Sequence, residues 1–216
     1  GPFLSSMLNT LLKVFVVVSA LSMMGIEMTS FVAILGAAGL AVGLALSGTL
    51  QNFAGGVIIL ILKPFKVGDF IEAQGYSGTV SSIQIFNTVL KSPDNKTIII
   101  PNGGLSTGAL TNYSTEPTRR VDWTVGIGYG DDIEKARKIL LEIVSADERV
   151  FKEPAPFIQV SALADSSVNL ATRVWVNTGD YWSVSMETNE KIYNEFNKQG
   201  ITIPFPQMYV HVHKQN

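Results

Sequence analysis

One long stretch without charge constrains this chain more than any other feature. From Met28 to Leu62 the sequence contains no Asp, Glu, Lys or Arg. Wound as an α-helix at 1.5 Å per residue, this stretch would be about 50 Å long, whereas the hydrocarbon core of a bilayer is roughly 30 Å thick. We therefore expect a membrane-crossing helix that bends or breaks before the stretch ends.

The dipeptide Ser47-Gly48 marks the expected bend, because helices kink preferentially at Gly and Ser pairs. The polar pair that follows it lies where a span begun near residue 29 would leave the hydrocarbon core. We expect a crossing helix up to Leu46 and a second helix, residues 49–62, that lies along the interface.

A second apolar segment precedes this stretch. Residues 3–24 are mostly apolar, and about 20 residues suffice to span the hydrocarbon core. Lys13 within it is expected to extend its charge to the nearer interface. Lys63 and Lys66 follow the uncharged stretch, and the positive-inside rule places them in the cytosol. The sequence thus predicts two antiparallel spans followed by a cytoplasmic part.

The uncharged helix is built largely from the smallest residues, although each Gly costs about 1 kcal/mol of helix propensity relative to Ala. In bilayers, small residues let helix backbones approach closely. At about 100° per residue, Leu40 and Leu44 lie on one face, with glycines on one flank and alanines on the other. The face also holds Ala33 and Ala37, the glycine flank holds Gly36, Gly39 and Gly43, and the alanine flank holds Ala41 and Ala45.

Two arrangements fit this distribution of residues. If copies stand around an axis, the alanine flank of one packs into the glycine groove of the next, which closes a head-to-tail ring. Leu40 and Leu44 would then project toward the centre, where rings of leucine close a pore by dewetting. The alternative is a small-residue helix packed inside an ordinary transporter bundle.

Three motifs closely resemble those of the small-conductance mechanosensitive channel (MscS) family. They are Leu35-Gly-Ala-Ala-Gly-Leu-Ala-Val-Gly-Leu-Ala-Leu-Ser-Gly-Thr-Leu-Gln-Asn-Phe-Ala-Gly-Gly56, Lys63-Pro-Phe-Lys-Val-Gly-Asp69 and Ile100-Pro-Asn-Gly103. The resemblance extends over essentially the whole chain. It implies an α-helical transmembrane region followed by a small all-β (Sm-like) barrel domain and an α+β (ferredoxin-like) domain, assembled as a homo-heptameric ring.

The resemblance also implies roles for residues of the uncharged helix. Leu40 and Leu44 match the hydrophobic seal of the family, Gly48 its kink and Gly56 a second flexible point. Ser47 departs from the Gln that well-studied bacterial members carry before the kink glycine. The helix-packing surfaces are matched by Ala33, Gly36, Ala37, Gly39, Ala41 and Gly43, and the helical wheel adds Ala45.

The rest of the sequence supports this division. Short apolar alternations broken by turns follow Val67 and favour a small barrel. After Arg119 the pattern indicates the strand, helix, strand, strand, helix, strand order of a ferredoxin-like unit. We expect residues 1–27 to form the helix before the pore helix, 28–66 the kinked pore helix with its interfacial second half, 67–114 the Sm-like domain, 115–206 the α+β domain and 207–216 the C-terminal strand of an oligomeric barrel.

The expected function is an ion channel of the inner (plasma) membrane, opened by membrane tension, that releases ions and small osmolytes on hypo-osmotic shock. Two alternatives stay open: a family-like channel gated mainly by a ligand or partner, and a membrane-tethered Sm-like binding module. The net charge of −2 offers no basic footprint for nucleic acid. The expected partners are other copies of the chain and membrane lipids.

We expect neither an enzyme nor a cofactor. The sequence has no cysteine, which excludes disulfides and thiolate metal sites. The glycines of residues 126–130 lack the spacing of a phosphate loop, and the acidic pair after them more simply caps a helix. His211 and His213 alternate along a strand without a third ligand, so no metal site is expected.

Overall fold

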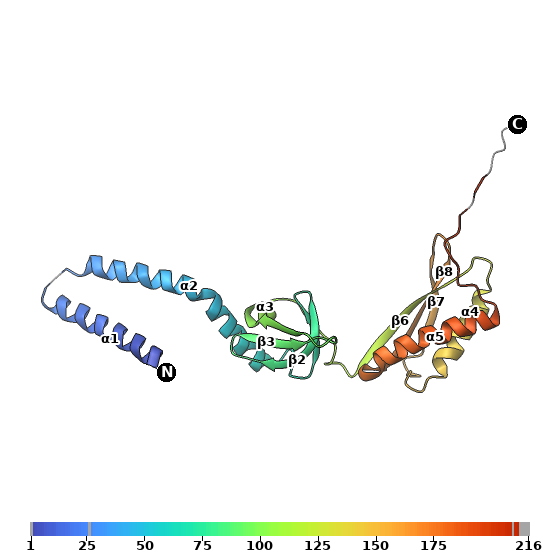
Figure 1. Ribbon diagram of the computed structural model, residues 1–216, viewed down its shortest axis with the longest axis horizontal. Coiled ribbons are helices and arrows are strands. Elements are labelled where there is room, and N and C mark those ends of the chain that lie inside the picture. Colours follow the sequence, from blue (N-terminus) through green and yellow to red (C-terminus); the bar gives the residue numbers. More distant parts are fainter. Residues whose placement is uncertain (1, 26, 209, 212–216) are drawn as a thin grey trace. The chain divides into compact units, whose positions relative to one another are not determined.

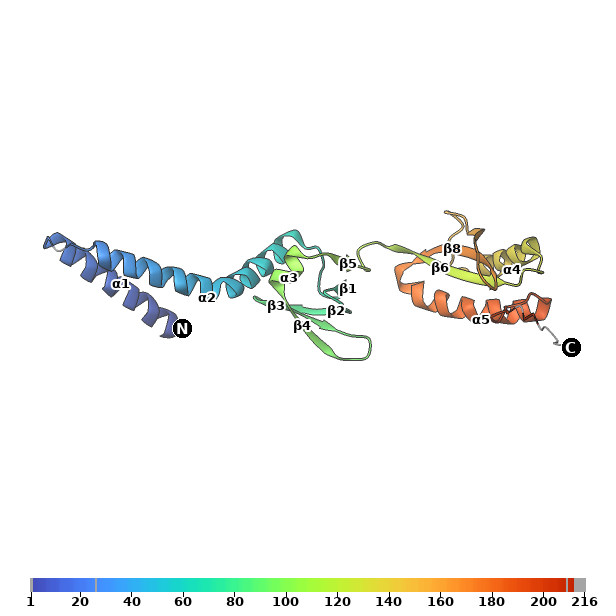
Figure 2. The ribbon, with the colours of Figure 1, turned by 90° about the horizontal axis from the view of Figure 1, so that it is seen from above.

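The computed structural model describes residues 2–25, 27–208 and 210–211, and side chains from residue 5 onward. The chain divides into two compact units, residues 1–111 and residues 112–216. Each unit has its own hydrophobic core. Figures 1 and 2 show the helices of the first unit followed by a β-sheet, and a second sheet with its two helices in the second unit.

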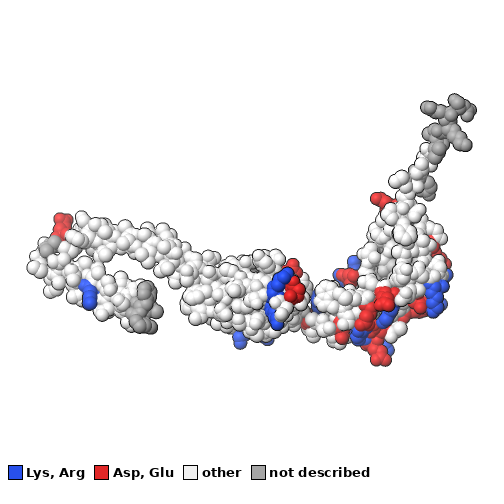
Figure 3. Space-filling model, viewed as in Figure 1, with Lys and Arg blue, Asp and Glu red and all other residues white. Residues whose placement is uncertain are grey.

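Two helices begin the first unit, α1 (Pro2–Met23) and α2 (Thr29–Leu62). Both are long and apolar enough to cross a membrane. Figure 3 shows that charged side chains are nearly absent from this part and gather over the rest of the chain. The expectation of two apolar spans is therefore met by two helices of the required length.

The helix α2 runs through Ser47 and Gly48 without interruption, so the predicted separation into two helices after Leu46 is wrong. Figures 1 and 2 show instead that its ribbon bends while remaining helical. A glycine costs only about 1 kcal/mol in a helix interior and keeps its backbone N–H, so it softens a helix without ending it. A kink at Gly48 itself stays a prediction.

The sheet of the first unit has five strands in the order β4-β3-β2-β1-β5, and the first four of this order pair antiparallel. Tight turns join them; the turn between the first two strands places Gln74 and Gly75 at φ 53° and 79°. Ile59 of α2 and Phe65 pack with the apolar side of this sheet in one core. The elements are β1 (Phe70–Ala73), β2 (Tyr76–Ile83), β3 (Asn87–Lys91), β4 (Thr97–Pro101), the short helix α3 (Asn102–Thr107) and β5 (Leu110–Asn112).

The second unit is an antiparallel sheet in the order β6-β8-β7 with two helices. The inward side chains of β6 and β8 pack with the apolar faces of these helices in the larger of the two cores. Asp132 caps α4, because its Oδ1 accepts hydrogen bonds from the backbone N–H of Glu134 and Lys135 at 2.9 and 3.1 Å. The elements are β6 (Thr118–Ile127), α4 (Ile133–Ser145), β7 (Phe157–Leu163), β8 (Val168–Asn177), a 3₁₀ turn (Thr178–Asp180) and α5 (Tyr181–Gln199).

The C-terminal strand expected over residues 207–216 is not formed where the chain is described. Gln207, Met208, Val210 and His211 adopt no strand, and residues 209 and 212–216, His213 among them, lie outside the described part. A strand that pairs with neighbouring copies has no partner in a single chain. The strand of an oligomeric barrel therefore stays a prediction.

A cluster of charged side chains ties the turn after α4 to α5. Asp147 is almost buried and contacts Arg149 at 2.7 Å and Lys191 at 3.3 Å. Arg149 also contacts Glu187 at 2.6 Å. The hydrogen bond from Arg149 holds the pKa of the Asp147 carboxyl well below its usual range and also lowers the pKa of Glu187. Both carboxyls are therefore stabilised in their ionised form.

Candidate functional site

The first half of α2 exposes the face on which the sequence places the seal. Leu40 and Leu44 are 66% and 67% exposed in the single chain. They lie four residues apart in a continuous helix and hence one turn apart on the same side. Large apolar side chains in such a row require lipid, a neighbouring helix or a dewetted pore around them.

The glycines of this half of the helix have empty surroundings within the chain. A methyl group built at Gly36, Gly39, Gly43 or Gly48 would meet no atom within 4 Å. Their cost in helix propensity is therefore not offset by packing against any described part of the same chain. The groove they form is open to a second helix, as the spacing predicts.

Ser47 makes a contact directly beneath the expected seal. Its Oγ donates a hydrogen bond to the backbone carbonyl of Leu44 at 2.9 Å. A Ser that bonds back to the preceding turn competes with the helical N–H for that carbonyl and favours bending. Ser47 and Leu44 are thus coupled through the backbone in this conformation.

The second half of α2 is anchored to the sheet by close backbone contact. A Cβ at Gly55 would lie 2.6 Å from the carbonyl oxygen of Asn102, and one at Gly56 would lie 2.6 Å from the carbonyl oxygen of Ile85. Both glycines are buried. Gly56, the expected second flexible point, therefore lies in a tight contact, and a hinge there stays a prediction.

Hydrogen bonds reinforce this anchor. Asn52 Oδ1 accepts a hydrogen bond from the backbone N–H of Gly103 at 3.0 Å. The buried side chain of Asn102 accepts one from Thr88 Oγ1 at 2.8 Å and donates one to the carbonyl of Gln84 at 2.8 Å. The first turn of α3 is therefore fixed to α2, to strand β3 and to the turn between β2 and β3.

Sequence reasoning missed this anchor. It interpreted Asn52 as a residue leaving the hydrocarbon core and used the motif around Asn102 and Gly103 only to recognise the family. The available signal was a second group of small and polar residues, Asn52 and Gly55, placed beyond the bend and outside the expected membrane span. Their partners lie about 50 residues away, a distance at which local patterns carry no information.

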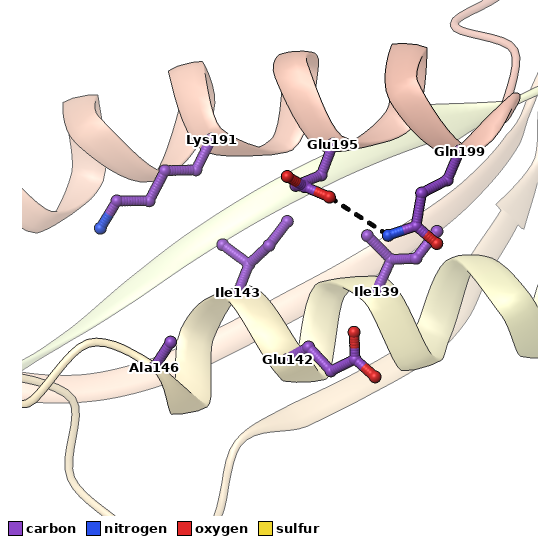
Figure 4. A pocket seen from close by; sticks show the side chains of 7 residues that line it. All are labelled: Ile139, Glu142, Ile143, Ala146, Lys191, Glu195 and Gln199. Carbon is purple, nitrogen blue, oxygen red and sulfur yellow. Dashed lines mark hydrogen bonds between the residues drawn. The ribbon is translucent and has the colours of Figure 1, made fainter.

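An open groove of about 320 Å³ lies between α4 and α5 in the second unit (Figure 4). Ile139, Ile143 and Ala146 line it from α4. Across from them, Gln199 Nε2 donates a hydrogen bond to Glu195 Oε2 at 3.2 Å, which lowers the pKa of that carboxyl. Its floor is apolar, and its charged groups form its walls.

Metal-binding side chains do not gather anywhere in the described residues: no group of three or more His, Asp or Glu could hold an ion there. His211 is exposed and belongs to no such group. The geometry that distinguishes this molecule is therefore the exposed half of α2 and its anchored half.

Three family models of mechanosensitive ion channels match residues 7–115 and 121–203 of this chain. Residues 7–47 match the family model "Mechanosensitive ion channel, transmembrane helices 2/3", residues 48–115 match "Mechanosensitive ion channel, beta-domain", and residues 121–203 match "Mechanosensitive ion channel MscS, C-terminal". The border between the first two models falls at Ser47 and Gly48, within α2.

Individual relatives resemble nearly the full chain. A small-conductance mechanosensitive channel of Edwardsiella ictaluri is 42% identical over 98% of this chain and 74% of its own length. A small-conductance mechanosensitive channel of Helicobacter pylori is 34% identical over 99% of this chain and 78% of its own length. These relatives favour the channel over the membrane-tethered binding module.

Solved structures agree with the sequence relatives. A solved structure of closed-state MscS of Helicobacter pylori superposes with a TM-score of 0.92 at 34% identity, covering 99% of this chain and 85% of that one. Arabidopsis thaliana MSL1 has the same fold, with a TM-score of 0.70 at 21% identity over 83% of this chain and 67% of its own. The predicted fold class is confirmed: two N-terminal membrane helices, a β domain and an α+β domain. The chain is a membrane protein that forms homo-oligomers, and it belongs to the MscS family of mechanosensitive ion channels.

Proposed function

We propose that this chain is one subunit of a tension-gated channel that releases ions and small osmolytes when a cell swells in a dilute medium, and that it has no enzymatic activity. The observation that carries this proposal is the first half of α2, where a row of exposed leucines stands beside open glycine grooves. Such a surface becomes stable when copies of the helix surround an axis.

In this ring, the flank with Gly36, Gly39 and Gly43 receives the flank with Ala41 and Ala45 of the next copy. The remaining surface residues, Ala33 and Ala37, extend the contact toward the start of α2. Leu40 and Leu44 face the axis and form the constriction, because two stacked leucine rings exclude water. The family resemblance supports seven copies.

Gating follows from the difference in membrane area between two conformations. Tension favours whichever conformation occupies more area in the membrane plane. The size of that area difference determines how far a given tension shifts the equilibrium between the two conformations. If α1 tilts with the lipid, it displaces the first half of α2 and separates the leucine rings. In the present conformation the second half is held on α3 by Asn52 and Gly55, so bending begins near Ser47 and Gly48.

The orientation follows from charge. Lys63 and Lys66 come directly after α2, and the positive-inside rule places them on the cytosolic side. We therefore propose an inner (plasma) membrane protein whose two C-terminal domains lie in the cytoplasm, in contact with lipid along α1 and α2.

Suction applied to excised patches that contain the purified protein tests the trigger. We expect current that rises with pressure, and a protein that stays silent at all pressures would contradict tension gating. Leu44→Ser tests the constriction: a polar ring at this level should rehydrate the pore and produce leak or opening at lower tension. Leu46→Ser is the matched control, because residue 46 lies on the opposite side of the same helix.

A further inference from the structure

The end of the second unit beyond α5 carries an unusual apolar projection. Phe205 is 82% exposed and stands between Pro204 and Pro206. Proline fixes its own φ and restricts the residue before it to extended backbone, so this Phe is presented on a stiff segment. Gln207 Nε2 adds a hydrogen bond to the carbonyl of Phe205 at 3.0 Å, which stiffens the segment further.

Two hydrogen bonds from backbone N–H groups of this segment hold it against the body of the unit. Asp131 accepts one from the backbone N–H of Thr202 at 2.8 Å, and Ser166 Oγ accepts one from the backbone N–H of Gln207 at 3.0 Å. Asp131 also accepts the backbone N–H of Gly128 at 3.0 Å. The direction in which the chain leaves α5 is therefore determined by the turns after β6 and β7.

A hollow of about 940 Å³ lies between the segment and these two turns. Tyr129 and Leu163 belong to its walls, and Leu163 is 72% exposed. The Tyr129 hydroxyl donates a hydrogen bond to the carbonyl of Ala164 at 2.6 Å, so one wall is fixed before anything binds. Pro204 and Met208 of the segment line this hollow, whereas Phe205 is not among its lining residues.

We propose that Phe205 of one subunit inserts into this hollow of the neighbouring subunit. The occupant is a second copy, because the protein is a homo-oligomer and because Phe205 does not line the hollow of its own unit. Two such surfaces form a head-to-tail contact that continues around a ring. A rigid aromatic side chain loses little conformational freedom on insertion, and Tyr129, Leu163 and Met208 offer it an apolar wall within this partly polar hollow.

This proposed contact presupposes the ring of subunits described under Proposed function. It assigns Phe205 to the interface between neighbouring subunits of that ring. The absence of cysteine from this sequence permits a direct test in the chain itself. In the double variant Phe205→Cys with Leu163→Cys, each subunit offers one thiol to each neighbour. Oxidation should therefore give a ladder of covalent species larger than two subunits on denaturing gels, while each single variant stops at two.

Phe205→Cys with Tyr193→Cys is the matched control, since Tyr193 is also exposed but lies on α5 away from the hollow; it should give no ladder. A ladder from the first pair alone supports the contact. An intramolecular disulfide, or dimers from Phe205→Cys alone with no ladder from the pair, would overturn it. So would an intact oligomer without any cross-link.

A second measurement does not depend on oxidation. Phe205→Ala should lower the temperature at which the oligomer dissociates, while Phe205→Leu should restore most of the loss and Tyr193→Ala should have no effect. The unfolding of the second unit should stay unchanged in all three. If Phe205→Ala dissociates like the unchanged protein, the contact is wrong while the ring stands. If the unchanged protein is a monomer, the ring itself is wrong, and the contact with it.

Discussion

The Oδ1 atom of Asn52 accepts a hydrogen bond at 3.0 Å from the backbone N–H of Gly103, which joins the long helix to the β domain across 51 residues of sequence. This bond stabilises the present conformation by about 0.5–1.5 kcal/mol relative to any conformation that lacks it. Asn52→Ala should therefore lower the population of the present conformation, relative to one without this hydrogen bond, by a factor of roughly 2 to 10. The membrane tension needed to leave the present conformation should fall accordingly.

Patch recordings of Asn52→Ala measure that threshold. Gly103→Ala should shift it in the same direction, because a Cβ at Gly103 would lie 2.9 Å from Asn52 Oδ1. Thr49→Ala removes a polar group from the same helix without touching α3 and should leave the threshold unchanged. Opposite shifts for Asn52→Ala and Gly103→Ala would argue against this hydrogen bond as the coupling contact.

Two glycines of one helix should respond differently to the same substitution. A Cβ at Gly55 meets the backbone of Asn102 at 2.6 Å, whereas a Cβ at Gly48 meets nothing within 4 Å. Overpacking of this kind typically costs 1–3 kcal/mol. Gly55→Ala should therefore lower the thermal stability of the β domain, and Gly48→Ala should leave folding intact and change gating only. Equal unfolding temperatures for the two variants would contradict the close contact.

Acid should weaken the second unit through Asp147. The folded-state pKa of this carboxyl is lowered by the hydrogen bond from Arg149. A lowered pKa means that the stabilisation is fully present above the unfolded-state pKa, about 4 for Asp, and is lost as the pH falls below it toward the folded-state value. Thermal unfolding followed from pH 7 to pH 2 should therefore show a steeper loss of stability below about pH 4 than in Asp147→Asn.

The control for this prediction is an exposed ion pair. Arg120 and Asp122 contact each other at 2.8 Å on the surface of the same sheet. Solvent screens the attraction within such an exposed pair, so the pair contributes little to the free energy of unfolding. Asp122→Asn should therefore retain the acid dependence of the unchanged protein, and a variant that loses it would show that the dependence does not arise at Asp147.

Two buried threonines allow a matched comparison of hydroxyl groups. Thr172 and Thr88 are both 0% exposed. Thr172 Oγ1 has no hydrogen-bond partner among the described residues, whereas Thr88 Oγ1 donates to Asn102. A buried hydroxyl without a partner carries a penalty of about 1–3 kcal/mol. Thr172→Val should therefore raise the unfolding temperature and Thr88→Val should lower it, as differential scanning fluorimetry can establish.

The sequence was most informative where a property is local. The absence of charge between Met28 and Leu62 predicted a membrane helix, because burial of charge in hydrocarbon is costly at every position of the run. The short apolar alternations broken by turns after Val67 indicated the strands of the β domain, because each turn type depends on a few adjacent residues. These predictions needed no knowledge of distant contacts.

The predictions that failed or stay open depend on partners outside the local sequence. The expected separation at Ser47 and Gly48 overestimated the effect of a glycine, because α2 continues through both residues. The contact of Gly55 with Asn102 was missed because its two sides lie far apart in sequence. The roles of Leu40 and Leu44 depend on other subunits, whose positions no single chain contains.

Because α2 is one continuous helix, an insertion or deletion within it changes the angle between the side chains of its two halves. Each residue inserted between Leu44 and Gly55 would rotate one relative to the other by about 100°. If Gly55 kept its place on α3, one inserted residue would turn the row of Leu40 and Leu44 away from the proposed pore axis. Seven inserted residues would bring Leu44 back to within about 20° of its original direction relative to Gly55. Insertions and deletions should therefore be excluded from this segment except in multiples that approach whole turns.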